Sequence, residues 1–148
     1  MRIKQLMIVV ACVGIALGLI SCKEERKIVG TWELVKTQEV LVIKNHPNAK
    51  YNVTRDTTTY PEAGESFILT FTKNGVVLAQ ETDSHGNTDS DSFPYMIMDN
   101  KLYVESMEYA FSIKGKEMTL TNEKTYTLTY DNTEYQRYEK EVMTLKER

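Results

Sequence analysis

The chain is poor in the residues on which most enzymes rely for catalysis. It has only two histidines, His46 and His85, and both stand among polar residues. The sequence contains no Ser-His-Asp spacing, no His-x-x-x-His pair and no glycine-rich phosphate loop. Its carboxylates are scattered rather than paired along one strand. We therefore expect no catalytic residues, no cofactor and no enzymatic activity.

An excess of basic residues is also missing. The 148-residue chain has 18 Lys and Arg against 21 Asp and Glu, a net charge of −3. Without Arg2 and Lys4 the balance is 16 against 21, a net charge of −5. Binding to nucleic acid depends on neutralising backbone phosphates with a basic surface. Nucleic acid is therefore not an expected partner.

Long apolar runs are absent, with one exception at the start. After the basic Arg2 and Lys4, the 15 residues from Leu6 to Ile20 carry no charge. A run of this length fits the apolar core of a secretory signal peptide. A helix that spans a membrane needs about 20 apolar residues, so a retained helical anchor is the weaker alternative. We predict a signal peptide over residues 1–21.

The next residues resemble the lipobox of bacterial lipoproteins. Leu19-Ile20-Ser21-Cys22 has its aliphatic residue, tolerant position, small residue and cysteine. The resemblance implies cleavage before Cys22, diacylglycerol on its thiol and a further acyl chain, such as palmitate, on its amino group. Two or three chains anchor a protein firmly, whereas one binds marginally. Because Cys12 would be discarded and Cys22 acylated, the mature chain would have no disulfide and no cysteine-based site.

Residues 22–27 are then a tether, and it carries a further resemblance. Lys23-Glu24-Glu25 is similar to the surface-export signal of Bacteroidota lipoproteins, in which lysine and two acidic residues follow the lipidated cysteine. The alternative is an ordinary charged spacer. In that case, lysine at position 23 resembles the pattern of lipoproteins that are sorted to the outer membrane and face the periplasm. We expect an outer-membrane lipoprotein, with the face of the membrane left open.

Residues 28–148 have the alternation of a single all-β domain. Apolar and polar residues alternate through several segments. These segments include 67–72, 93–97, 109–113, 118–121 and 126–130. Turn-forming pairs such as Asn74-Gly75 and Asp131-Asn132 separate them. The pattern predicts hairpin-linked antiparallel strands in a sandwich or barrel, with polar loops over 45–64 and 82–92.

The start of this domain resembles lipocalin-like domains. Gly30-Thr31-Trp32 matches the Gly-x-Trp of their first strand, and the later strands are similar to lipocalin-like lipoproteins of Bacteroidota. The resemblance implies a single antiparallel up-and-down barrel of about 8–10 strands. It also implies that Gly30 and Trp32 close one end of the barrel and that the other end takes a small apolar molecule. The usual C-terminal helix of that family is not recognisable after Met98.

An eight-stranded barrel is just wide enough to be filled by side chains or to hold one small ligand. Large side chains at alternating positions are the expected interior and the candidate ligand contacts. They are Phe67, Leu69, Phe71, Tyr109, Phe111, Tyr126, Leu128 and Tyr130. Two functions remain open: an envelope protein that binds a small hydrophobic or amphipathic molecule, and an interaction or structural lipoprotein with a filled core.

The two predicted loops contain weaker candidates for sites. In the second, a cluster of acidic residues and one histidine has the oxygen ligands that calcium prefers, but its spacing matches no calcium loop, and we expect no metal. The cluster consists of Asp83, His85, Asp89 and Asp91. In the first loop, Asp56-Thr57-Thr58 resembles the O-glycosylation sequon of Bacteroidota, which would place a glycan on Thr57.

Overall fold

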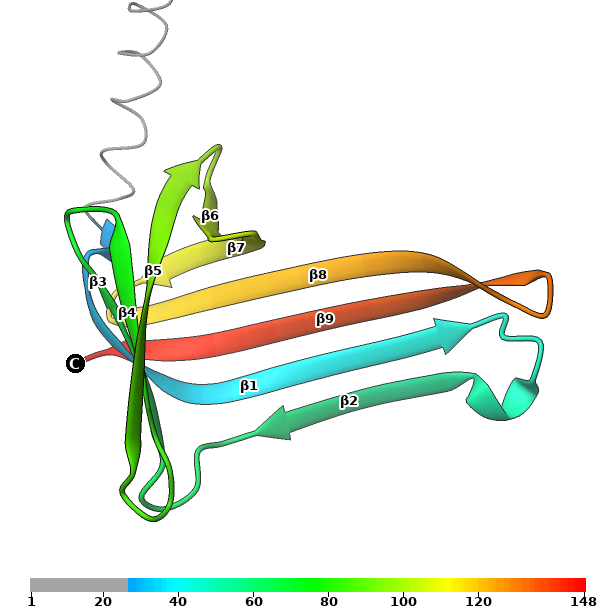
Figure 1. Cartoon of the computed structure of the whole chain (residues 1–148), viewed down its shortest axis with the longest axis horizontal. Helices are drawn as coiled ribbons and strands as arrows, with labels where there is room; N and C mark the ends of the chain where they lie inside the picture. Colours follow the sequence, from blue (N-terminus) through cyan, green and yellow to red (C-terminus); the bar gives the residue numbers. More distant parts are fainter. Residues whose placement is uncertain (1–26) are drawn as a thin grey trace, which may run out of the picture.

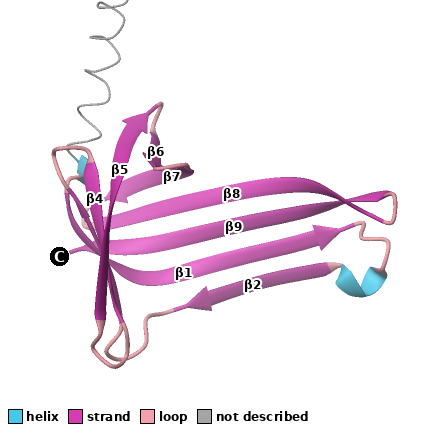
Figure 2. Cartoon of the chain, viewed as in Figure 1, coloured by secondary structure: helices cyan, strands magenta, loops and turns pink. Residues whose placement is uncertain are grey.

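The computed structural model describes residues 27–148, which form one sheet of nine strands. The strands are β1 (Gly30–Lys44), β2 (Val53–Thr59), β3 (Ser66–Phe71), β4 (Val76–Thr82), β5 (Thr88–Met98), β6 (Lys101–Val104), β7 (Met107–Lys114), β8 (Glu117–Tyr130) and β9 (Thr133–Glu147). A short 3-10 helix, η1 (Ala49–Tyr51), precedes β2 (Figure 2).

Eight of these strands close into an antiparallel barrel. The order β1-β3-β4-β5-β6-β7-β8-β9 returns to β1 because β1 also pairs with β9 along most of its length. Every neighbouring pair is antiparallel, and from β3 onward the strands follow one another in chain order. The predicted all-β up-and-down barrel of about 8–10 strands is confirmed, and its architecture is compatible with a lipocalin-like fold.

Three strands are much longer than the barrel needs, and their outer halves leave it together. β1, β8 and β9 have 15, 14 and 15 residues, whereas β3 has six. With β2 on the free side of β1, they form a four-stranded sheet in the order β2-β1-β9-β8, which we call the arm. Figure 1 shows the arm projecting to one side of the barrel.

The arm begins where β1 exchanges one partner for another. Gly30 to Glu33 pair with β3, whereas Thr37 to Ile43 pair with β2 on the same edge. Between them, the register with β9 shifts between Leu34 and Lys36, which marks a β-bulge. β2 and β3 thus pair one after the other with the same edge of β1, and a polar connection separates them.

The barrel core is apolar and continuous. It is formed by inward residues of all eight barrel strands, together with Ile28, which is fully buried just before β1. The rings of Phe71 and Tyr95 pack edge to face with centroids 5.1 Å apart, and the Tyr95 hydroxyl donates to the Thr72 carbonyl at 2.8 Å. At the β3–β4 turn, Gly75 has a φ of 73°, a conformation that glycine adopts without strain.

Our prediction of a long loop over residues 45–64 was wrong. This stretch contains η1 and β2, and its loop character is limited to the ends. All seven residues of β2 are exposed, so neither face of the strand required apolar residues, and no alternation marked it. The second loop is also shorter than predicted, because β4 and β5 pair out to Thr82 and Thr88.

Candidate functional site

Trp32 packs into the barrel core, where its cross-strand partner Leu69 also lines the cavity described below. Its side chain is only 2% exposed, and its indole Nε1 donates to the Ile28 carbonyl at 2.8 Å. A β-carbon added to Gly30 would lie 3.7 Å from that same Nε1, so the glycine leaves room beside the indole. The contacts of Trp32 are therefore with the chain itself.

The barrel interior also holds an apolar cavity of about 120 Å³. Strands β3 to β9 contribute the side chains that surround it. The lining residues are Phe67, Leu69, Val77, Ala79, Phe93, Val104, Glu105, Met107, Tyr109, Leu120 and Met143. A ligand pocket for a drug-sized molecule measures about 300–1,000 Å³, whereas an apolar cavity of about 150 Å³ accepts benzene. The cavity therefore suits one ring or the end of an acyl chain.

Five of the eight residues predicted to line the barrel interior lie there. Phe67, Leu69 and Tyr109 line the cavity. Phe71 is buried deeper, at 2% exposure, and Phe111 packs against the core from a partly buried position. The cavity and the filled core therefore coexist at two levels of one barrel.

For the remaining three residues, the predicted interior position was wrong. Tyr126, Leu128 and Tyr130 belong to the outer part of β8, on the arm, and the two tyrosines are 37% and 54% exposed. Only Glu117 to Thr121 of β8 pair with β7, so the strand leaves the barrel after Thr121. The alternation of apolar and polar residues in β8 continues unchanged past Thr121. The sequence therefore does not indicate where the strand leaves the barrel.

A polar groove of about 360 Å³ adjoins the cavity on the same face of the sheet. Leu120 and Met143, which line the cavity, are cross-strand partners. One step outward along the same face, Asn122 pairs with Glu141, which pairs with Glu39. The apolar interior therefore continues directly into a charged surface.

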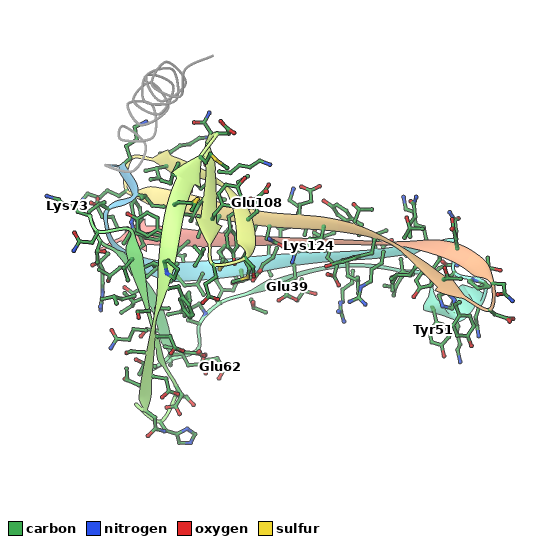
Figure 3. The ribbon with its side chains drawn as sticks, turned by 45° about the horizontal axis from the view of Figure 1, so that its top comes forward. Glu39, Tyr51, Glu62, Lys73, Glu108 and Lys124 are labelled. Atoms are coloured by element: carbon green, nitrogen blue, oxygen red, sulfur yellow. The ribbon has the colours of Figure 1, made fainter. Side chains whose placement is uncertain are left out.

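The next row of the groove places basic side chains at both edges of the arm. Across the sheet from β2 to β8, the row reads Arg55, Leu41, Glu139 and Lys124. Figure 3 shows Glu39 and Lys124 on the part of the arm nearer the barrel. Within residues 27–148, no carboxylate lies within ion-pair distance of Arg55 or Lys124.

Burial raises the pKa of two groups where the groove meets the cavity. Partial burial, followed by the charge of Glu39 opposite, raises the pKa of Glu141. Burial raises the pKa of Tyr109, and the Glu141 charge raises it further, which places the two groups within electrostatic reach. One row beyond Glu139, Arg137 forms an ion pair with it, while the Arg137 Nε is buried and has no hydrogen-bond partner in the described part of the chain.

A second groove, of about 300 Å³, lies where β1 exchanges β2 for β3. Leu34 and Thr37 on β1 line it together with Thr59, Pro61 and Phe67. Phe67 also lines the cavity, so its ring separates the cavity from this groove. The mouth of the barrel is therefore hollowed on two sides.

The far end of the arm carries an aromatic cluster that sequence reasoning missed. The His46 ring lies 4.9 Å from Tyr51, 5.1 Å from Tyr130 and 4.7 Å from Tyr135, measured between centroids. Lys50 lies over the Tyr51 ring at 4.6 Å, and Figure 3 shows Tyr51 at the far end of the arm. No sequence signal joins these residues, because the register of β1 with β9 brings them together.

The predicted acidic loop has a structural role in the hairpin of β4 and β5. The Asp83 carboxylate accepts from the backbone of His85 at 2.8 Å and of Asn87 at 2.9 Å, and from the Asn87 side chain at 2.8 Å. The Asn87 side chain is the main cause that lowers the pKa of Asp83. Asp89 and Asp91 lie on β5, and the described residues include no group of three His, Cys, Asp or Glu placed to hold a metal.

Thr57 lies on the exposed strand β2, rather than in a loop. Its cross-strand partner is Glu39 on β1.

The signal peptide over 1–21, the lipid site Cys22 and the export signal at Lys23 to Glu25 lie outside the described residues. Over residues 27–148, none of the helices has the length and apolar character needed to cross a membrane. Comparisons with protein-family models, curated proteins and solved structures found no match for this chain.

Proposed function

We propose that this chain is a non-enzymatic lipoprotein, anchored in the outer membrane by lipid on Cys22, that binds a small amphipathic molecule at the mouth of its barrel. The observation that most supports this proposal is the apolar cavity that opens beside a charged groove on one face of the sheet. The apolar end of the ligand enters the cavity beneath Phe67 and Met143. Its polar end lies over the row that contains Asn122, Glu141 and Glu39.

The dimensions of the cavity limit the ligand. A volume of about 120 Å³ accommodates a ring or a short stretch of acyl chain, and not a whole lipid. Each methylene transferred from water to such a site contributes about 0.8 kcal/mol. Most of the specificity would therefore come from the polar groove, where polar and charged side chains lie beside the second part of the ligand.

A binding assay with a fluorescent alkylamine, whose cationic head group suits Glu141 and Glu39, tests this proposal. Ala79 faces the cavity, so Ala79→Phe fills it and should weaken binding by about tenfold or more, equivalent to about 1.4 kcal/mol. Leu78→Phe adds a similar ring to the outer face of the same strand, where Leu78 is 46% exposed, and should leave affinity unchanged. Equal affinities of the two variants, both folded by circular dichroism, would contradict the proposal.

The second candidate is an interaction or structural lipoprotein, and the arm favours it. A four-stranded sheet that leaves the barrel is not needed to enclose a cavity, and its outer strand β2 is exposed at every residue. Under this proposal the barrel is a support, and variants in the cavity have no effect on function. Both candidates use the arm, and they differ in whether the cavity is needed for function.

A further inference from the structure

The two edges of the arm differ in how well they are protected from pairing with another strand. The outer edge of β2 carries Arg55 and Asp56 in the middle of its seven residues. Charged residues at the centre of an edge are a common protection against strand addition. The outer edge of β8 has its only charges, Glu123 and Lys124, near the barrel. From Thr125 to Tyr130 it has no charge, no proline and no glycine.

Within residues 27–148, β9 pairs with one edge of this stretch of β8 and no strand lies beside its outer edge. β7 pairs with β8 only as far as Thr121, and the Asn122 side chain closes that junction by donating to the Glu108 carbonyl at 2.7 Å. Beyond it, the backbone groups that point away from β9 are unpaired up to Tyr130. Alternating threonine with tyrosine or leucine has high β propensity, so the edge is well suited to accept another strand.

We propose that two copies of this chain pair antiparallel through the free edges of β8, with the two-fold axis at Tyr126. Such an axis is perpendicular to the sheet and keeps each face on the same side, so directly opposed residues differ by an even number. Centred on Tyr126, the pairing uses all nine residues from Asn122 to Tyr130. The two arms then form one continuous sheet that is closed by symmetry.

The side chains opposed in this register are compatible. Thr125 opposes the partner's Thr127, a cross-strand threonine pair that contributes favourably, about 0.2–1 kcal/mol. Lys124 opposes the partner's Leu128, and Glu123 opposes the partner's Thr129, so no like charges meet. Glu123 is already engaged within its own copy, where it accepts from the Tyr138 hydroxyl at 2.8 Å.

A two-fold axis placed on the free edge of β2 gives a less favourable pairing of two copies. An axis at Arg55 or Asp56 places that residue opposite its own copy, which is destabilising. An axis at Thr57 avoids this but pairs only the residues from Arg55 to Thr59. The charge pattern therefore selects β8 over β2 as the edge that joins two copies. The pairing does not involve the cavity, although Asn122 and Lys124 belong both to the paired stretch and to the polar groove.

Cross-linking of the full chain tests the proposed dimer. Tyr126→Cys places thiols of two copies on either side of the axis, within reach of a short bismaleimide. We expect a cross-linked dimer well above the unsubstituted background, whereas Thr57→Cys, on the same face at the other edge, should give none. Equal cross-linking at the two positions, or none at either, would overturn the proposal.

A pair of charge variants tests the register, in the Tyr126→Cys background. Thr125→Lys with Thr127→Lys opposes lysines across the axis, and the cross-linked dimer should be lost. Thr125→Lys with Thr127→Glu opposes lysine to glutamate twice, and the dimer should be retained. Both variants should keep the circular dichroism of the parent. If the two give equal amounts of dimer, the proposed pairing is wrong.

Discussion

At the scale of single residues, Trp32 holds the start of β1 against the core, because its Nε1 donates to the buried Ile28 carbonyl. The Gly-x-Trp pattern and the alternation around it placed an indole in the core, where the structure has it 2% exposed. Its hydrogen bond to Ile28 could not be predicted, because Ile28 precedes the strand and has no pattern of its own. The indole fixes the entry of the chain into the barrel.

Replacing Trp32 by phenylalanine should destabilise the barrel. Trp32→Phe removes the donor to the buried Ile28 carbonyl, and an unsatisfied buried group costs about 1–3 kcal/mol. Denaturant unfolding followed by circular dichroism measures the loss, since the chain has no other tryptophan to report by fluorescence. Tyr60→Phe, at a side chain that is 65% exposed, is the control and should leave the midpoint unchanged.

Glu141 should make stability depend on pH. Its pKa is raised in the folded state, so the folded protein holds a proton that the unfolded chain releases. Stability contributed by this group is therefore full below the ordinary value of 4.5 and falls as pH rises through the raised pKa.

Relative to the parent, the Glu141→Gln variant should lose less stability between acid and neutral pH. This part of its profile of unfolding midpoint against pH should therefore be flatter. Unfolding of both proteins from pH 4 to pH 8 tests it. Glu134→Gln, at an exposed position near the start of the same strand, is the matched control. A Glu141→Gln profile parallel to that of the parent would contradict the assignment.

At the scale of elements, the sequence predicted strands better than it predicted their partners. The alternation located β3, β5, β7 and β8, and Asn-Gly and Asp-Asn pairs located their turns. The point at which β8 leaves the barrel had no signal, since Leu120 inside and Tyr126 outside continue one alternation. β2 had no apolar face at all. Register and strand length, rather than local pattern, decide what belongs to the arm.

The turn between β8 and β9 should stabilise the arm without stabilising the barrel. Asp131 and Asn132 have φ values of 48° and 58°, the conformation of a two-residue type I′ turn. Asn132→Val places a β-branched residue in the left-handed region, at a cost of about 1–2 kcal/mol. Asn132→Gly should cost little.

Amide hydrogen exchange distinguishes the local effect from a global one. In the Asn132→Val variant, exchange should accelerate in the outer halves of β8 and β9 and remain slow at Leu102 and Met118, which are fully buried in the barrel. Uniform acceleration through barrel and arm would show that the two unfold as one unit.

At the scale of the whole molecule, the barrel and the arm have different physical bases. The barrel has a closed apolar core, and closure leaves it no free edge. The arm has two exposed faces and two free edges, and cross-strand pairs supply most of its stability. The candidate ligand site lies where the two meet, with apolar groups from the barrel and charged groups from the arm.

The amphipathic ligand that we propose inserts its apolar end into the cavity. Nuclear Overhauser contacts between a medium-chain alkylamine and the methionine methyl groups would detect this insertion. We expect contacts from the terminal methyl of the ligand to Met107 and Met143, which line the cavity. We expect none to Met96 and Met98, which are 58% and 52% exposed on the outside. Contacts to the exposed pair alone, or to neither pair at saturating ligand, would contradict it.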